Sequence, residues 1–312
     1  MRYPRSSPCG APPEAGYVEG RPARALPTTG GAAWHPRAIR YAPTVIFAKW
    51  QGLGNHYIVV DRDELPFPLT PARARRLCDP NFGVGGDGIL EVSHDGDTPR
   101  MTVWNPDGSQ AENCGNGIRM VGRYLDATGR LPADGVILTG AGDATVKVRD
   151  DELVEVAMGR ATFPAGEIRE QVRVGSLAVD LTEVSMGNPH AIIEHPAPEE
   201  VVREWGPPLE AAPRFPERTN VEFVRTEGPG EITMRVWERG AGETLACGTG
   251  ACAAAVEGVR LRGLSSPVTV HLAGGDLLIA VDDDLEVTMT GPAEEIYRGE
   301  ISPALLQALE DL

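Results

Sequence analysis

The feature that most constrains the fold of this 312-residue chain is an internal duplication with a fixed spacing of 133 positions (247 − 114 = 133). "TVWNPDGSQAENCGNG", residues 102–117, aligns with "RVWERGAGETLACGTG", residues 235–250, and each segment has a cysteine directly before Gly-x-Gly. The same spacing relates further pairs: Gly54-Asn55 with Gly187-Asn188, Gly142-Asp143 with Gly275-Asp276, and Asp150-Asp151 with Asp283-Asp284. A spacing that holds without an insertion indicates two copies of one domain.

The duplicated unit is too long for a solenoid repeat of about 20–50 residues. Short β-branched runs separated by Gly, Asp and Pro predict strands and hairpins. These runs are residues 44–50, 56–63, 88–93, 136–158, 231–238 and 268–289. Helices are predicted at residues 70–79, where Thr70 suits the N-cap and Pro71 the first helical position, and directly after Cys114 and Cys247. We therefore predict an α+β fold of two pseudo-symmetric domains whose cysteines flank the cleft between them.

The predicted domains occupy residues 45–165 and 166–295. Residues 1–44 contain eight prolines, six arginines and no lysine, so they cannot bury enough apolar surface to offset the entropy of ordering and are predicted to be a disordered extension. Residues 296–312 are predicted to pack back on the N-terminal domain.

The charge balance excludes one class of partner. With 29 basic and 45 acidic residues the net charge is −16, whereas nucleic-acid binding depends on basic surfaces. No apolar run approaches the ~20 residues of a membrane helix, and the beginning of the chain lacks the apolar stretch of a signal peptide. Five cysteines are few and odd in number, which favours reduced thiols. We expect a cytoplasmic protein that binds neither nucleic acid nor membrane.

The paired cysteines predict a chemistry. A cysteine at a helix start lies beside unpaired backbone N–H groups, which can lower a thiol pKa from about 8.5 into a range of roughly 3.5–7.5 and can also bind an anion. A thiolate on one face of a carbon atom can remove its proton while a thiol on the other face returns one. Cys114 and Cys247 are therefore predicted to be the general acid–base pair of a racemase or epimerase.

Other sulfur chemistry is less favoured. Cys78 and Cys252 are predicted to be packing residues, and no function is predicted for Cys9. No Cys-x-x-Cys pair is present in the sequence, so no metal site is predicted. Opposed thiols could also form a disulfide under oxidation, which would be an inactivated form.

"GVGGDG", residues 83–88, matches the dinucleotide-binding pattern letter by letter. That fingerprint follows a strand and opens a helix, whereas this segment follows a predicted helix and leads into a predicted strand. Its glycines are therefore expected to form tight turns.

Residues 46–301 resemble the diaminopimelate epimerase family. The motifs that carry the resemblance are "GLGN" (52–55), "GVGGDG" (83–88), "NPDGSQAENCGNG" (105–117), "MGNPH" (186–190), "FPERTNVEF" (215–223) and "ERGAGETLACGTGAC" (238–252). The resemblance implies two domains, each a curved, barrel-like, mostly antiparallel sheet around a central helix, with the active site in the cleft. It also implies a homodimeric isomerase that converts LL-2,6-diaminopimelate to meso-diaminopimelate for lysine and peptidoglycan precursors, without pyridoxal phosphate or another cofactor.

In the family's terms Cys114 and Cys247 are the catalytic pair. The implied substrate-binding residues are Asn55, Asn105, Gly115, Asn116, Asn188, Asn220, Glu238, Arg239, Gly248 and Thr249. Arg239 can grip a carboxylate bidentately and Glu238 can pair with an ammonium group, while His190 is a candidate supporting residue. Two departures are His56-Tyr57, where the family commonly has Asp-Phe, and Thr249 in place of a frequent serine.

Two rival functions remain open from the sequence. One is a racemase or isomerase of the same fold that acts on another amino acid, as in proline-racemase-like, histidine-racemase or phenazine-pathway relatives, although the two cysteines disfavour the last. The other is a non-catalytic module that closes on an amino acid or a metal.

Overall fold

The computed structural model describes residues 44–111, 114–196 and 198–312. Except for Thr44, the predicted disordered extension lies outside the described residues. From Thr44 onward the chain belongs to one compact unit, and the domain limits at residues 45–165 and 166–295 stay predictions.

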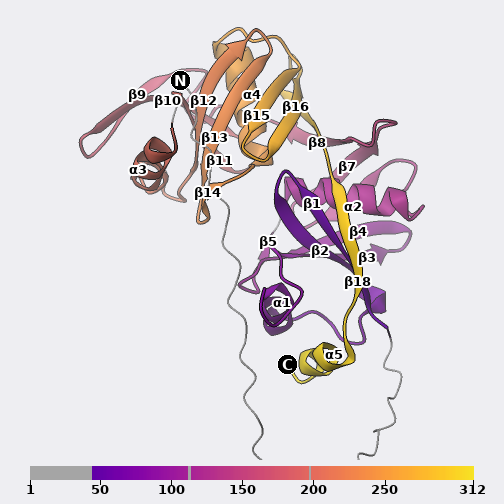
Figure 1. The fold of residues 1–312 in the computed structure, drawn as a ribbon. Coiled ribbons are helices and arrows are strands. Elements are labelled where there is room, and N and C mark those ends of the chain that lie inside the picture. The colour runs from indigo at the N-terminus through magenta and orange to yellow at the C-terminus, as the bar shows by residue number, and fades with distance from the viewer. Residues whose placement is uncertain (1–43, 112–113, 197) are drawn as a thin grey trace, which may run out of the picture. The chain divides into compact units, whose positions relative to one another are not determined.

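Among the described residues, the structure contains two runs of elements in the same order, apart from η1 in the first run and β9 in the second. The first run is β1 (Ile46–Gly52), β2 (Asn55–Asp61), the 3-10 helix η1 (Arg62–Glu64), α1 (Pro71–Cys78), β3 (Ile89–Asp95), β4 (Thr98–Trp104), β5 (Gln110–Ala111), α2 (Gly115–Ala127), β6 (Val136–Thr139), β7 (Gly142–Val148) and β8 (Val154–Arg160). The second is β9 (Glu170–Val174), β10 (Leu177–Ser185), β11 (Pro189–Glu194), α3 (Glu199–Glu210), β12 (Asn220–Gly228), β13 (Glu231–Glu238), β14 (Gly242–Thr244), α4 (Gly248–Leu261), β15 (Val268–Leu272), β16 (Gly275–Val281) and β17 (Glu286–Gly291), followed by β18 (Glu294–Glu300) and α5 (Pro303–Glu310). Figure 1 shows the two runs in different colours.

The strand pairings repeat as well. In the first run β2 pairs parallel with β3, β3 antiparallel with β4, and β4 parallel with β6. In the second run β11 pairs parallel with β12, β12 antiparallel with β13, and β13 parallel with β15. The remaining ladders are antiparallel. The predicted α+β fold with two pseudo-symmetric, mostly antiparallel halves is confirmed.

A pseudo-two-fold axis passes through the ladder that joins the two halves. β8 pairs antiparallel with β17, and Val156 lies opposite Met289. These two residues are 133 positions apart, so each is the repeat equivalent of the other. Only a two-fold relation places a strand against its own copy at this register, since any other register would pair non-equivalent residues.

Helices α2 and α4 are the buried helices of the two halves. Both contact several strands of their own half and also contact each other. Their buried side chains belong to one continuous apolar cluster that includes residues of both halves, such as Val121 and Val256. The sequence pattern explains this burial, because α2 presents large apolar residues on one face while α4 is mostly alanine and can be enclosed on all sides.

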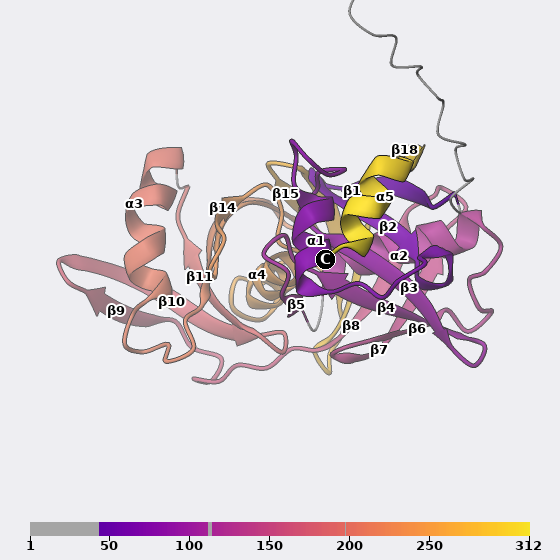
Figure 2. The same ribbon diagram turned by 90° about the horizontal axis from the view of Figure 1, so that it is seen from below.

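Outer helices cover the strands of each half. α1 and α5 pack with β1 and β2 in a second cluster that contains Leu77 and Leu309, and Figure 2 shows the two helices side by side. β18 pairs antiparallel with β1. In the other half, α3 covers β12 and β13 through a third cluster that contains Leu209 and Phe223.

The predicted helices α1, α2 and α4 are confirmed, including the Thr70 cap, whose side chain accepts a hydrogen bond from the Arg73 N–H. Two described α-helices were not predicted. α3 contains Pro207 and Pro208, which argue against a helix when the sequence is read locally. α5 has the start signal that predicted α1, since Ser302 is its N-cap and Pro303 its first residue, but this signal was not recognised in the sequence.

Removing the Leu125 side chain tests the packing of α2. Leu125 is fully buried in the shared cluster, so Leu125→Ala should lower the free energy of unfolding by roughly 2–5 kcal/mol, measured by urea titration with far-ultraviolet circular dichroism. Leu312→Ala, at a side chain that is 54% exposed, should stay within about 0.5 kcal/mol of the unmodified protein. Equal effects of the two substitutions would contradict this account of the core.

Candidate functional site

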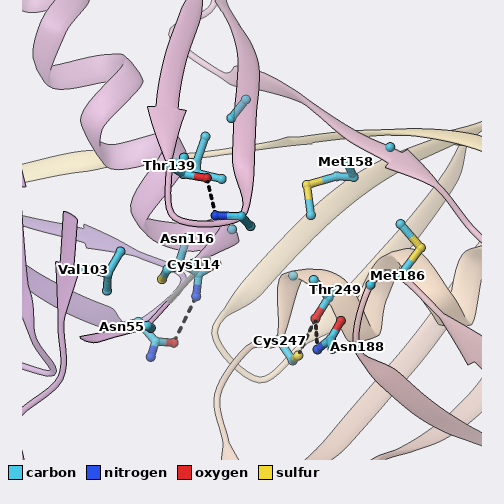
Figure 3. Close-up of a pocket in the computed structure, with 18 of the residues that line it drawn as sticks. Asn55, Val103, Cys114, Asn116, Thr139, Met158, Met186, Asn188, Cys247 and Thr249 are labelled. Atoms are coloured by element: carbon cyan, nitrogen blue, oxygen red, sulfur yellow. Dashed lines mark hydrogen bonds between the residues drawn. The ribbon is translucent and has the colours of Figure 1, made fainter. Parts of the chain in front are cut away.

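A cavity of about 740 Å³ is lined by residues of both halves. The predicted site residues that line it are Asn55, Asn105, Cys114, Gly115, Asn116, Asn188, Glu238, Arg239, Cys247, Gly248 and Thr249. Figure 3 shows Cys114 and Asn55 on one side of this cavity and Cys247 and Thr249 on the other. The two predicted residues outside this lining are Asn220 and His190.

Each cysteine is the N-cap of the buried helix of its own half. Cys114 precedes α2 in an extended conformation, and its Sγ accepts a hydrogen bond from the Gly117 N–H at 3.3 Å. Cys247 precedes α4, and its Sγ accepts one from the Gly250 N–H, also at 3.3 Å. Gly117 and Gly250 are repeat equivalents, so the two thiols occupy the same position in the two copies.

The two helix N-termini converge near the pseudo-two-fold axis. A β-carbon added to Gly115 would lie 3.5 Å from Met289 Cε, and one added to Gly248 would lie 3.2 Å from Met289 Sδ. Because Met289 lies on the axis, both N-termini adjoin the same side chain. Their unpaired N–H groups and positive dipole ends therefore face one small region, which suits an anionic group.

Burial dominates the ionisation of both thiols. It raises the pKa of Cys114, although a hydrogen bond with Tyr57 and one from the Gly117 N–H act in the opposite direction. Burial also raises the pKa of Cys247, well above its usual value, and the carboxylates of Glu238 and Glu222 add to the rise. The backbone N–H hydrogen bond at each helix start acts to lower the pKa, but removal from water is the larger effect, so the thiol pKa is raised rather than lowered as the sequence suggested.

A chain of polar side chains lies behind Cys247. Cys247 Sγ is 3.6 Å from Thr249 Oγ1, which accepts a hydrogen bond of 3.3 Å from Asn188 Nδ2. The His190 ring then lies between Asn188 Oδ1, 3.1 Å from Nε2, and Glu222 Oε1, 2.7 Å from Nδ1. His190 and Glu222 are almost completely buried and do not line the cavity, so their hydrogen bonds reach it only through this chain, although the Glu222 charge also acts on Cys247.

A different set of side chains lies behind Cys114. Its Sγ is 3.5 Å from Tyr57 Oη. Asn116 donates a hydrogen bond of 3.3 Å to Asn55 Oδ1 and accepts one of 3.0 Å from Arg119. Arg119 is fully buried, where burial lowers the pKa of its guanidinium to about 10, and it also donates to Pro292 O at 3.2 Å.

Asn105 and Asn220 form hydrogen bonds within the protein. Asn105 donates to Ser109 Oγ at 2.9 Å. Asn220 does not face the cavity, because its Nδ2 donates to Pro189 O at 3.0 Å and its Oδ1 accepts from the Arg239 N–H at 2.9 Å. It fixes the backbone beside the site.

Glu238 is a largely buried carboxyl group of the cavity lining. Thr244 Oγ1 donates a hydrogen bond to its Oε1. Burial raises the pKa of this carboxyl, while the hydrogen bonds with Thr244 and Cys247 oppose the rise.

The sequence reasoning missed Tyr57, Arg119 and Glu222 as site residues. One signal was available for Tyr57, because it is the repeat equivalent of His190 (190 − 57 = 133). Arg119 and Glu222 are charged residues in otherwise apolar segments, and nothing local indicates that they are buried.

The other cysteines with a described position, Cys78 and Cys252, are buried packing residues as predicted, and burial raises their pKa values to about 11 and about 12. The four described cysteines are free thiols. Among residues 44–111, 114–196 and 198–312, no cluster of His, Cys, Asp and Glu is arranged to hold a metal ion. No described helix is long and apolar enough to cross a membrane.

Comparison with known proteins gives a consistent family. A family model described as "Diaminopimelate epimerase" matches residues 47–164 and 182–296. "Diaminopimelate epimerase" of Synechococcus sp. (strain JA-3-3Ab) is 45% identical over 275 residues, covering 81% of this chain and 96% of the relative. The protein of the same name from Pelotomaculum thermopropionicum is 43% identical over 273 residues, covering 81% and 98%.

Solved structures share the fold at much lower identity. A hydroxyproline epimerase from Agrobacterium vitis, with bound trans-4-hydroxy-L-proline, superposes with a TM-score of 0.62 at 14% identity, covering 86% of this chain and 96% of that one. At this identity the likeness concerns the fold alone.

Gly250, three residues after Cys247, can be tested for close packing. A β-carbon at Gly250 would lie 2.6 Å from the buried Glu222 Oε1 and 3.2 Å from Cys247 Sγ, so Gly250→Ala should lower the free energy of unfolding by about 1–3 kcal/mol. Gly115→Ala meets no atom closer than 3.5 Å and should be neutral or stabilising by up to about 1 kcal/mol. Thermal unfolding of both variants measures the difference, and a tolerated Gly250→Ala would contradict the packing described.

Proposed function

The chain belongs to the diaminopimelate epimerase family, and from this we propose that it interconverts LL-2,6-diaminopimelate and meso-diaminopimelate with Cys114 and Cys247 as the two acid–base groups. The observation that carries the proposal is the placement of two repeat-equivalent thiols on one cavity, each at the N-terminus of a buried helix. A binding protein has no need of two such groups, whereas inversion at a carbon atom has.

The proposed reaction removes one proton from the α-carbon of the substrate and adds another to the same carbon. A thiolate takes the α-hydrogen as a proton, so the C–H bond breaks, an S–H bond forms and the electron pair stays on the substrate. The opposite thiol then gives its proton to the other face of the same carbon, which becomes inverted. The enzyme ends with the two protonation states exchanged, and proton exchange with solvent restores them.

The helix N-termini would stabilise the intermediate. When the α-proton leaves, negative charge spreads onto the α-carboxylate. The N–H groups of Gly115-Asn116 and Gly248-Thr249 lie at the positive ends of α2 and α4, beside the cavity. Dipoles fixed before the reaction stabilise developing charge without having to reorganise.

The charged rim suits a substrate with a second amino-acid end. Arg239 and Glu238 line the same cavity, so a substrate carboxylate can pair with Arg239 and a substrate ammonium group with Glu238. Asn55, Asn105 and Asn188 add amide donors and acceptors. Asn220 supports Arg239 from outside the cavity lining, because its Oδ1 accepts a hydrogen bond from the Arg239 backbone N–H.

The supporting chain behind Cys247 has a defined role in this proposal. His190 and Glu222 fix the orientation of Asn188, and through it the Thr249 hydroxyl beside the thiol.

The homodimer that the sequence resemblance implies and the cytoplasmic location stay predictions.

Deuterium exchange tests the proposed chemistry. In heavy water the unmodified protein should convert LL-diaminopimelate to the meso isomer with deuterium at the α-carbon, followed by NMR and chiral chromatography. Cys114→Ala and Cys247→Ala should each slow inversion by at least about 10²-fold, because one of the two proton transfers is lost. Cys78→Ala, a buried thiol outside the cavity lining, serves as the control. Inversion at an undiminished rate in either active-site variant would refute the two-thiol mechanism.

Arg239 tests the second charged end of the substrate. Arg239→Gln removes a bidentate carboxylate contact worth about 1.5–3 kcal/mol, so kcat/KM for diaminopimelate should fall by roughly 10- to 150-fold. Arg225→Gln, at an exposed arginine on β12, is the matched control. A panel that includes proline and histidine separates the rival substrates, and faster turnover of either amino acid would replace diaminopimelate as the substrate.

A further inference from the structure

Tyr57 lies against Cys114 with little freedom to move. It belongs to β2, it is 8% exposed, and its hydroxyl oxygen is 3.5 Å from Cys114 Sγ. Its ring rests against Gly88, where an added β-carbon would lie 2.6 Å from Tyr57 Cε1 and 2.6 Å from Trp104 O. Only a glycine at position 88 lets the ring lie this close to the backbone.

The glycine-rich loop 83–88 braces the segment that carries Tyr57. The His56 N–H donates to Asp87 Oδ2 at 2.9 Å, and the Asp87 N–H donates to His56 O at 2.8 Å. The Ile58 N–H donates to Gly88 O at 3.0 Å, and the buried Lys49 ammonium donates to Gly85 O. Hydrogen bonds therefore hold the chain on both sides of Tyr57, so this loop has a structural purpose that the dinucleotide pattern does not explain.

The contact between Tyr57 and Cys114 changes character when the thiol ionises. A thiol can donate to the phenol oxygen, but a thiolate can only accept, so the phenol must then donate. Cys114 and burial raise the pKa of the Tyr57 hydroxyl, which keeps its proton available for this bond. A hydrogen bond to a charged partner is about twice as strong as one to a neutral partner, so the contact favours the thiolate.

The other groups that face the two thiols differ in sign. Near Cys114 are the Arg119 guanidinium, which favours the thiolate, and Glu238, which disfavours it. Near Cys247 the charged groups that act on it are Glu238 and Glu222, and both disfavour the thiolate, against the hydrogen bonds from Thr249 and the Gly250 N–H. The duplicated scaffold thus carries two unequal thiols.

We propose that Tyr57 is a positioning residue whose hydroxyl holds Cys114 as the ionised member of the pair, with Cys247 as the protonated member. Its repeat equivalent His190 does not contact Cys247 directly and reaches it through Asn188 and Thr249. The role of Tyr57 in turnover rests on the proposed function, whereas its effect on thiol ionisation does not.

Alkylation by iodoacetamide between pH 6 and pH 11, quantified for each cysteine by peptide mass spectrometry, tests the proposal in the full chain. In the unmodified protein the Cys114 profile should have its midpoint at lower pH than the Cys247 profile. Tyr57→Phe removes one oxygen atom and should move the Cys114 midpoint upward by about one to two pH units, while the Cys247 midpoint stays in place. Tyr124→Phe, which removes a hydroxyl that donates to Asp61 Oδ2, should move neither midpoint.

The direction of the shift follows from linkage. The hydroxyl stabilises the thiolate, so its loss requires a higher pH to ionise Cys114. Epimerisation by Tyr57→Phe should therefore fall by about tenfold or more near pH 7, and the deficit should shrink as the pH rises past the new midpoint. A merely structural role would lower the rate equally at every pH.

Three results would overturn the proposal: an unmoved Cys114 midpoint in Tyr57→Phe, an equal shift in Tyr124→Phe, or ionisation of Cys247 before Cys114 in the unmodified protein. Failure of the proposed function looks different. In that case the alkylation midpoints separate as expected, but the unmodified protein does not exchange the α-hydrogen of diaminopimelate.

Discussion

The constraint on which the structure depends is the pairing of β8 with its own copy, β17. Val156 faces Met289, its repeat equivalent, so the two halves are related by a two-fold axis through one strand ladder. That axis brings the N-termini of α2 and α4 against the same methionine. Because each cysteine caps its helix, a single ladder register fixes where both sulfur atoms lie.

Much of this arrangement follows from the sequence, because its signals are local or repetitive. The spacing of 133 residues predicted the duplicated topology, and the Cys-Gly-x-Gly motifs predicted the starts of α2 and α4. What the sequence could not supply depends on long-range packing. The β1–β18 pairing joins residues far apart in the chain, and α3 forms despite Pro207 and Pro208 because its apolar face packs against β12 and β13.

The site shows the same division between local and long-range effects. The positions of Cys114 and Cys247 as helix caps are local properties and were predictable. Their ionisation is not, because burial acts against the helix dipole and depends on the whole surrounding core. Arg119 and Glu222 likewise affect the ionisation of the thiols only because the fold buries Arg119 near Cys114 and Glu222 near Cys247. Asn220 supports the backbone of the site rather than lining the cavity, which no motif indicates.

The duplication also explains why the two halves had to diverge. Symmetry supplies two thiols that line one cavity, but two identical thiols would share one ionisation behaviour and would not specify which is charged. At equivalent positions the halves now carry Tyr57 and His190, Asn116 and Thr249, and Asn105 and Glu238. The backbone retains the two-fold symmetry, while these side chains make the surroundings of the two thiols different. In the proposed reaction that difference would distinguish the base from the acid and one end of the substrate from the other.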